Sequence, residues 1–244
     1  MERKIGEHPL WHIPVLGTVH SDTILTTWIV MVISLGFFWY VGASYRSPRV
    51  TKRQTTFEDL SNYLGDLAVS TLGPRGEPFV PFFIALFFMI FLLNQIGFIP
   101  LRALGLPFGG SPTADLNTTA AYAVIVFLMI QVVALRNHGV RAFSHLFQPF
   151  WFLFPINVIE EFARPVTLAL RLFFNIFVGE ILMYVVIVIM TSQVMIGSFN
   201  LSRAIIPLPF FLQFFNFFIG TLQAFVFTLL TIVYLSAAVA EEGH

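Results

Sequence analysis

The chain alternates between long apolar runs and short polar segments. Apolar runs over 23–43, 80–99 and 116–135 reach the ~20 residues that a helix needs to cross a bilayer. Two further runs, 155–191 and 205–239, are longer than one crossing requires. The pattern predicts an all-α polytopic membrane protein with about five transmembrane helices, treated as a single integral membrane domain over 1–244.

Residues 57–72 show a different pattern, in which apolar and polar residues interleave at helical spacing. Leu60 and Leu64 recur against Asp59 and Asp66. Such a segment is too polar to span a bilayer but suits its surface. We expect an amphipathic helix lying on the cytoplasmic side of the membrane.

The last two apolar runs are long enough to constrain their own orientation. As helices, 155–191 and 205–239 would measure roughly 55 and 52 Å, against a hydrocarbon core of about 30 Å. Their apolar composition argues against long protrusions into water. We therefore expect a steeply tilted antiparallel hairpin over 155–239, with a loop near 193–202.

Polar side chains form one stripe along the first helix of that hairpin. At about 100° per residue, six of them fall within roughly 40° of one another. They are Asn157, Glu160, Arg164, Thr167, Arg171 and Asn175. Arg171 stays charged at any depth, which costs between about 2.5 and 17 kcal/mol in a bilayer. We expect Arg171 to face water or a partner and to be functional; the alternative is a structural ion pair with a neighbouring helix.

Other polar residues are candidates for the same site. Glu180 lies about 180° around the helix from Arg171, so the two charges point to opposite sides. On the second helix, Asn216 and Gln223 share a face, and Gln223 is placed to hydrogen-bond Arg171. Amides in membrane helices are also ordinary interhelical contacts, worth about 0.6 to 2 kcal/mol.

Two polar sites flank the loop between the second and third spans. The amide pair at 94–95 near the end of 80–99 is either an interhelical contact or part of a water path. Asp115 precedes the third span and is either a helix N-cap or a carboxylate with a functional role. One residue can serve both roles. The loop itself, 101–113, is rich in Gly and Pro and is predicted to be external.

Composition excludes several other classes of protein. The chain of 244 residues is 57% hydrophobic and 11% charged, against about 25% charged in soluble domains. A net charge of zero gives no electrostatic support for a nucleic-acid partner. Without a cysteine or a phosphate-binding loop, we expect no cofactor and no ATP chemistry by the chain alone. His8 and His12 have metal-ligand spacing, but Pro9 and Pro14 interrupt a helix there, so no metal site is predicted.

Basic residues predict the orientation of the chain. A cluster follows the first span, comprising Arg46, Arg49, Lys52 and Arg53. Because such clusters mark the cytoplasmic side, we expect segment 1–21 outside and the C-terminus in the cytoplasm. Segment 1–21 lacks an apolar stretch after a basic start and does not read as a cleaved signal peptide.

Four strings in order resemble the a subunit of F-type ATP synthases. They are RPVTLALRLFFN at 164–175 with Gly179-Glu180, NQIGFIP at 94–100, ADLNT at 114–118 and LQAFVF at 222–227. Each string is weak alone, but together they cover most of the chain. The resemblance implies a proton-translocating stator subunit of the membrane sector.

The family resemblance also implies roles for residues and partners. Arg171 would face the carboxylates of a c-subunit ring and separate two aqueous half-channels. The outer half-channel would be lined by Asp115, Asn175, Glu180, Asn216 and Gln223. The cytoplasmic half-channel would be lined by Asn157, Glu160, Glu161 and Thr167. Further implied partners are b-type peripheral stalk subunits, the rest of the complex and membrane lipid, in a bacterial plasma membrane.

The chain departs from the family pattern at two positions. Many relatives have His where this chain has Asn216, and Asn cannot titrate, so Glu180 would relay through water. Relatives usually have Gly where this chain has Phe174, which alters how closely another helix can approach. The main rival function is a self-contained secondary transporter or channel. Such folds often carry internal repeats, and we find no convincing repeat between the two halves.

Overall fold

The structure, a computed structural model, describes residues 10–13, 17–44, 52–97, 110–139, 150–192, 195–196, 199–200 and 205–240. Within these ranges, five helical segments are long and apolar enough to cross a membrane. They are Ser21–Ala43, Phe57–Ile96, Leu116–Asn137, Trp151–Thr191 and Leu208–Val239. The predicted all-α polytopic membrane fold is confirmed.

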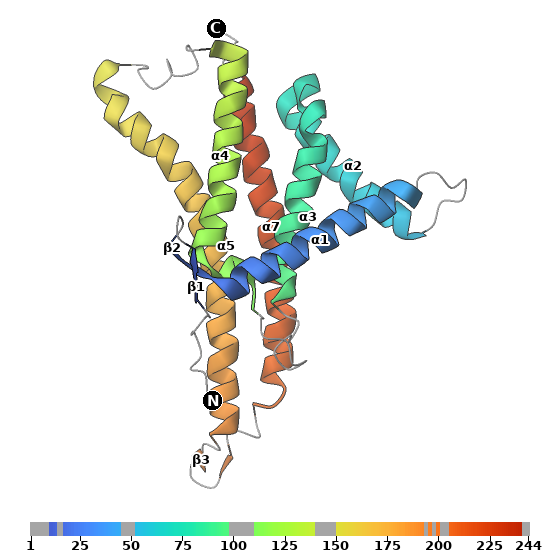
Figure 1. Cartoon of the computed structure of the whole chain (residues 1–244), viewed down its shortest axis with the longest axis vertical. Helices are drawn as coiled ribbons and strands as arrows, with labels where there is room; N and C mark the ends of the chain where they lie inside the picture. The colour runs from blue at the N-terminus through green and yellow to red at the C-terminus, as the bar shows by residue number, and fades with distance from the viewer. Residues whose placement is uncertain are drawn as a thin grey trace.

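The first half of the chain forms a short hairpin and three helices. They are β1 (Leu10–Ile13), β2 (Gly17–His20), α1 (Ser21–Ser44), α2 (Lys52–Leu72), the 3₁₀ helix η1 (Gly73–Phe79) and α3 (Val80–Ile96). Gly73 takes a positive φ of 67°, which favours glycine and breaks the helical path. Figure 1 shows the chain turning back there, so α2 and α3 lie beside each other as separate helices.

The predicted amphipathic character of α2 is confirmed by its burial pattern. Leu64, Ala68 and Leu72 are buried at every fourth position, while Asp59 and Asp66 are exposed. The buried face packs on α3 and on the last helix. Its position along the cytoplasmic surface remains a prediction.

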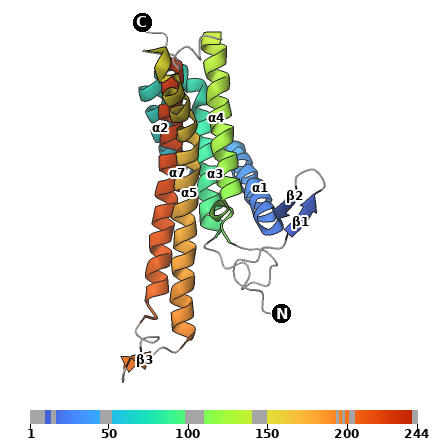
Figure 2. The ribbon, with the colours of Figure 1, turned by 90° about the vertical axis from the view of Figure 1, so that its left-hand side faces the viewer.

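The second half of the chain contains the long hairpin. Its elements are η2 (Pro112–Ala114), α4 (Leu116–His138), η4 (Trp151–Leu153), α5 (Phe154–Thr191), β3 (Met195–Ile196), β4 (Phe199–Asn200) and α7 (Leu208–Ala240). Figure 2 shows α5 and α7 running side by side along the long axis. At 1.5 Å per residue they are about 57 and 50 Å long. The antiparallel pairing agrees with the prediction, and the steep tilt in a membrane remains a prediction.

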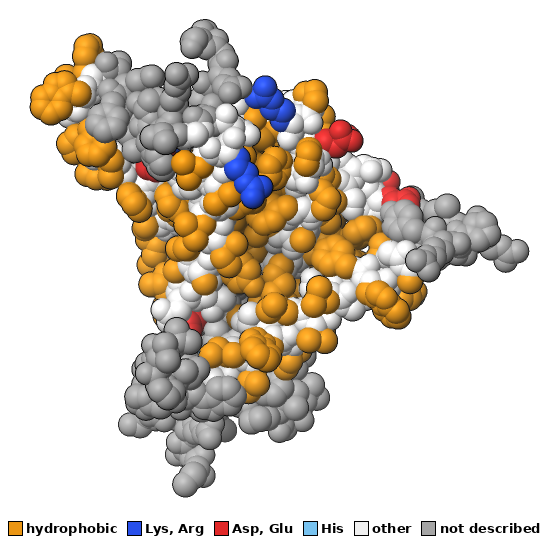
Figure 3. All heavy atoms as spheres, turned by 45° about the horizontal axis from the view of Figure 1, so that its top comes forward, with side chains coloured by type: hydrophobic (Ala, Val, Ile, Leu, Met, Phe, Trp, Pro, Cys, Tyr) orange, Lys and Arg blue, Asp and Glu red, His pale blue; other side chains and the backbone are white. Residues whose placement is uncertain are grey.

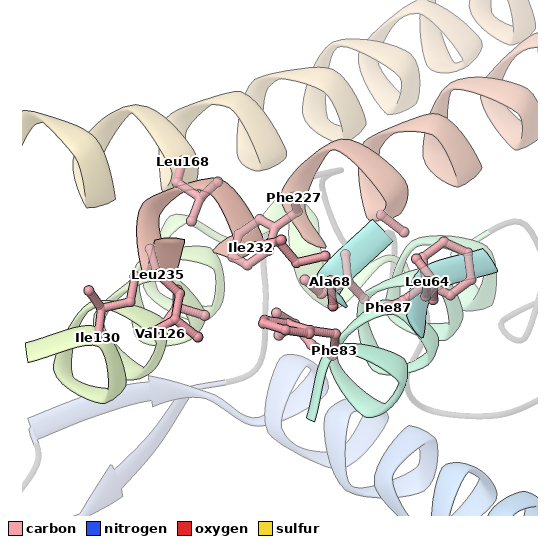
Figure 4. Packing of buried hydrophobic residues seen from close by; sticks show 14 of the residues in the cluster. Leu64, Ala68, Phe83, Phe87, Val126, Ile130, Leu168, Phe227, Ile232 and Leu235 are labelled. Atoms are coloured by element: carbon pink, nitrogen blue, oxygen red, sulfur yellow. The ribbon is translucent and has the colours of Figure 1, made fainter. Parts of the chain in front are cut away.

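One apolar core joins five helices. Leu64 of α2, Phe83 of α3, Val126 of α4, Leu168 of α5 and Phe227 of α7 all belong to it. Figure 4 shows these side chains converging between the helices. The core fixes α5 against α7, and it therefore fixes the polar residues that these two helices carry.

The outer surface is apolar as well. Trp39 is 77% exposed and Phe210 is 78% exposed. In Figure 3 hydrophobic side chains spread over the face shown, with few charged groups among them. Apolar area on this scale is costly in water and suits contact with lipid.

Two features of the fold were not predicted from the sequence. The two short antiparallel hairpins, β1 with β2 and β3 with β4, were not expected. The predicted external loop 101–113 contains Ser111 and Thr113, and both are buried against the helices. Residues 101–109, the basic residues Arg46 and Arg49, and the metal alternative at His8 and His12 fall on parts or side chains that the structure does not describe.

Candidate functional site

Arg171 lies on the outward face of α5. Its neighbours Leu168 and Leu172 are buried in the core, whereas Arg171 itself is exposed. No hydrogen bond or ion pair joins Arg171 to another residue in the part of the chain that the structure describes. An ion pair with a neighbouring helix of this chain is therefore not what holds the guanidinium here. A charge of this kind on an apolar face needs a partner from outside the chain or water.

The polar stripe predicted on α5 follows this exposed face. Its members are exposed or half-buried, and none is buried. They are Asn157, Glu160, Arg164, Thr167, Arg171 and Asn175. The stripe thus presents its polar groups away from the core over about five helical turns.

A polar pocket lies beside Glu180, which is nine residues beyond Arg171 towards the C-terminal end of α5. Its volume is about 170 Å³, which is ample for several water molecules. Asn175, Glu180 and Asn216 line it, together with Ser111 and Gln213. The structure therefore brings together three of the five residues expected in the outer half-channel.

Glu180 is held from outside its own helix. Its Oε1 accepts a hydrogen bond of 2.9 Å from the backbone N–H of Ser111. Ser111 belongs to the segment that leads into α4, so the contact joins the loop to α5. Nothing in the sequence indicates this contact, because a backbone donor is the same in every residue except proline.

Gln223 contacts Asn175 and makes no hydrogen bond to Arg171. Asn175 Nδ2 donates to Gln223 Oε1 at 2.7 Å, and the prediction that Gln223 holds Arg171 is wrong in this structure. Gln223 is buried, and its Nε2 has no hydrogen-bond partner among the described residues. The amide contact joins α5 to α7 at the edge of the pocket.

Asn216 packs against the backbone of α5. Its Nδ2 donates to the carbonyl of Gly179 at 3.4 Å. A Cβ added at Gly179 would lie 2.7 Å from Asn216 Oδ1, which is too close for an unshifted side chain. The glycine therefore lets the asparagine reach the neighbouring helix.

Asp115 lies in a different place from the other outer candidates. Its Oδ1 accepts from the backbone N–H of Asn117 at 2.9 Å, which makes it the N-cap of α4. Its Oδ2 lies 2.9 Å from His20 Nδ1. It lines a groove of about 690 Å³ between α1, α3 and α4. The N-cap alternative is confirmed, and a role at the mouth of a proton path remains a prediction.

The cytoplasmic candidates gather around Arg164. Its guanidinium lies 3.4 Å from Glu160 and 3.4 Å from Glu161. Gln131 of α4 donates to Glu161 Oε1 at 2.6 Å. Thr167 is exposed on the same face of α5. The two glutamates are thus brought together, with Glu161 the more buried of the pair.

The amide pair of α3 joins that helix to α7. Asn94 is buried, and its Nδ2 donates to the carbonyl of Gly220 at 2.9 Å. Gln95 Nε2 donates to Thr221 Oγ1 at 3.0 Å. The interhelical alternative is therefore the better account of both residues. No group of three metal-ligating side chains occurs within the described ranges.

Comparison with known proteins gives the family. The family model described as ATP synthase A chain matches residues 24–236. An "ATP synthase subunit a" of Desulforamulus reducens is 40% identical over 96% of this chain and 84% of the relative. Relatives of the same name are 39% identical in Acidothermus cellulolyticus, over 93% of this chain and 80% of the relative, and 37% in Moorella thermoacetica, over 91% and 92%. The chain therefore belongs to the ATP synthase A chain family.

Proposed function

We propose that the chain is the stator subunit that couples proton flow to rotor rotation, with Arg171 as its electrostatic gate. Membership of the family makes it a non-catalytic subunit of the membrane sector of an ATP synthase. The observation that carries the finer proposal is the exposure of Arg171 on α5 without a partner among the described residues. The family assignment favours this function over the rival of a self-contained transporter.

The partner of Arg171 is a carboxylate on a ring of c subunits. An ionised carboxylate is very costly in lipid, so in lipid it travels protonated and neutral. Opposite the guanidinium it is stabilised as the anion and releases its proton. Arginine does not give up its own proton, so Arg171 separates the two sides without carrying protons across.

Two groups of polar residues on α5 would serve the two sides of this gate. Glu161 and Glu180 are separated by about 28 Å of helix at 1.5 Å per residue, with Arg171 near the midpoint. That span is close to the ~30 Å of the hydrocarbon core. The outer path would run through the pocket of Glu180, Asn175 and Asn216, with Asp115 and Gln223 behind it. The cytoplasmic path would run past Asn157, Glu160, Glu161 and Thr167.

The exposed apolar surface supports contacts with lipid and with other subunits, and it supports a location in a membrane. We propose that the ring covers the face of α5 that carries Arg171, and that lipid and b-type stalk subunits contact other apolar faces. The membrane is the plasma membrane of a bacterium, with segment 1–21 outside. Proton flow along offset half-channels supplies about 2.3 kcal/mol per charge per 100 mV.

The decisive experiment compares vesicles that contain the assembled complex with wild-type chain and with Arg171→Ala. We expect the variant to lose ATP-driven proton pumping completely and to leak protons passively. Arg171→Lys keeps the charge but loses the planar donor fork, and we expect it to lose coupled transport as well. A variant that assembles and pumps like the wild type would reduce Arg171 to a structural residue and overturn the proposal.

A further inference from the structure

One donor that faces Glu180 belongs to the backbone. The Ser111 N–H lies 2.9 Å from Glu180 Oε1. Asn216, on the other wall of the pocket, donates to the Gly179 carbonyl and carries no titratable group. A backbone N–H does not titrate or change rotamer, so its value as a partner depends on how firmly the segment around it is held.

Two buried hydroxyl groups hold that segment. Ser111 Oγ lies 2.8 Å from the Leu93 carbonyl and 2.7 Å from Thr113 Oγ1. Thr113 Oγ1 lies 2.8 Å from Asn94 Oδ1. Each hydroxyl has one proton, so two protons are shared among three contacts. Thr113 and Asn94 are fully buried and Ser111 is 7% exposed, so a lost contact leaves a buried polar group without its partner.

The network ends on a close helix crossing. Asn94 Nδ2 donates to the Gly220 carbonyl at 2.9 Å, and a Cβ at Gly220 would lie 3.3 Å from Asn94 Cβ. At the other end, a Cβ at Gly97 would lie 2.6 Å from Ser111 Cβ and 2.8 Å from its backbone N. The segment at Ser111 is therefore fixed to α3, and through α3 to α7.

We infer that Thr113, Asn94 and Ser111 are positioning residues for Glu180. The network holds the Ser111 N–H against the carboxyl group and fixes the orientation in which Glu180 exchanges protons with the pocket. The inference rests on the proposed function, in which Glu180 lies on the outer proton path. The network thereby holds the Ser111 N–H as a fixed donor in a pocket where Asn216 supplies no titratable group.

The test compares ATP-driven proton pumping of vesicles that contain the whole complex. Thr113→Val keeps the shape of the side chain and removes one hydroxyl. We expect pumping to fall about fivefold, the factor that corresponds to about 1 kcal/mol for one hydrogen bond. Thr113→Ser restores the hydroxyl and should restore most of the pumping. The amount of assembled complex in each vesicle preparation is measured alongside.

A matched control separates this effect from loss of packing. Thr228→Val also removes a buried hydroxyl, but one that among the described residues bonds only to the Ala224 carbonyl of its own helix, and it should pump normally. In a Glu180→Gln background, Thr113→Val should cause no further loss, because the two changes act at one contact. Should Thr113→Val fail to assemble, Ser111→Ala keeps the N–H and removes the other hydroxyl, and the same loss of about fivefold is expected.

Three outcomes would overturn the inference, and one of them would also overturn part of the proposed function. Normal pumping by Thr113→Val would show that the hydroxyl positions nothing that matters. The same fractional loss with and without Glu180 would show a purely structural role. Normal pumping by Glu180→Gln alone would remove Glu180 from the path, and with it both the outer path proposed above and this inference.

Discussion

At the scale of single residues, the site depends on where side chains are missing as well as where they are present. Gly97, Gly179 and Gly220 each allow a polar group of another segment to approach their backbone. Their polar neighbours are Ser111, Asn216 and Asn94 respectively. Helix crossings in membranes are generally enriched in small residues for this reason. Here the close approaches surround the pocket that contains Glu180.

Gly97→Ala should therefore damage the site more than an ordinary glycine substitution. The added methyl would press on the Cβ and backbone of Ser111, and overpacking of this kind costs about 1–3 kcal/mol. We expect a lower melting temperature of the complex in detergent and weaker ATP-driven pumping.

Gly36→Ala is the matched control, because no atom lies within 4 Å of the added methyl. Alanine is also the better helix former by about 1 kcal/mol, so this variant should be as stable as the wild type or more so. Equal effects of the two substitutions would mean that the approach of Ser111 to Gly97 is not needed.

Residue-scale prediction from the sequence succeeded where a side chain carried the signal. The stripe on α5 and the shared face of Asn216 and Gln223 follow from helical spacing, and the N-cap Asp115 follows from its place before the third span. The contact from Ser111 to Glu180 could not be predicted, because the donor is a backbone group in a segment without periodicity. The predicted partner of Gln223 was wrong, because the spacing of residues on one helix does not determine which residue of the neighbouring helix each of them contacts.

At the scale of elements, α5 and α7 are joined by polar contacts at two levels. Asn175 bonds Gln223 at one level, and Asn216 reaches Gly179 at the other. Both contacts lie on the same side of Arg171 along α5. The hairpin is thus held by these hydrogen bonds at the pocket. On the other side of Arg171, the Arg164 guanidinium of α5 lies 5.8 Å from the ring centroid of Tyr234 of α7, and Leu168 packs in the apolar core.

Gln223→Leu should weaken coupled pumping by at most about fivefold, the equivalent of about one hydrogen bond. Asn175 is exposed and can bond water instead, which limits the loss. Pumping in vesicles, measured beside Arg171→Ala, checks the order of the two effects. A complete loss with Gln223→Leu and a partial loss with Arg171→Ala would mean that the gate has been assigned to the wrong residue.

The elements themselves were predictable because the bilayer demands long apolar helices. The predicted runs 80–99 and 205–239 differ from α3 and α7 by three residues at one end. The hairpins β1–β2 and β3–β4 were missed, since strands of two to four residues carry too little alternation to detect. The end of the predicted amphipathic segment at residue 72 agrees with the end of α2 at Leu72, directly before Gly73.

At the scale of the whole molecule, the apolar outer surface and the exposed arginine indicate a chain that contacts lipid and other subunits on its outer faces. Lipid suits the exposed aromatic residues of α1 and α7, and an anionic partner suits Arg171. The predicted orientation in the membrane rests on the basic cluster that follows the first span. It is therefore best tested by labelling.

Because the chain contains no cysteine, single cysteines can report its orientation without background. Ser192→Cys, at the end of α5, should react with a membrane-impermeant maleimide added to intact cells. Asn137→Cys, near the end of α4, should react only after the membrane is permeabilised. Both positions are exposed, so lack of access within the protein does not explain a failure. The reverse pattern would invert the predicted topology.

The backbone donor of Ser111 has a genetic consequence. A point mutation can replace any side chain, but only proline removes an N–H. This N–H, which bonds Glu180, is thus largely invisible to a mutational scan. The sensitivity belongs to its supports, Gly97, Thr113 and Asn94, none of which touches the carboxyl group in the described contacts. In this pocket, the positions at which substitutions impair function are therefore expected to differ from the positions that contact Glu180.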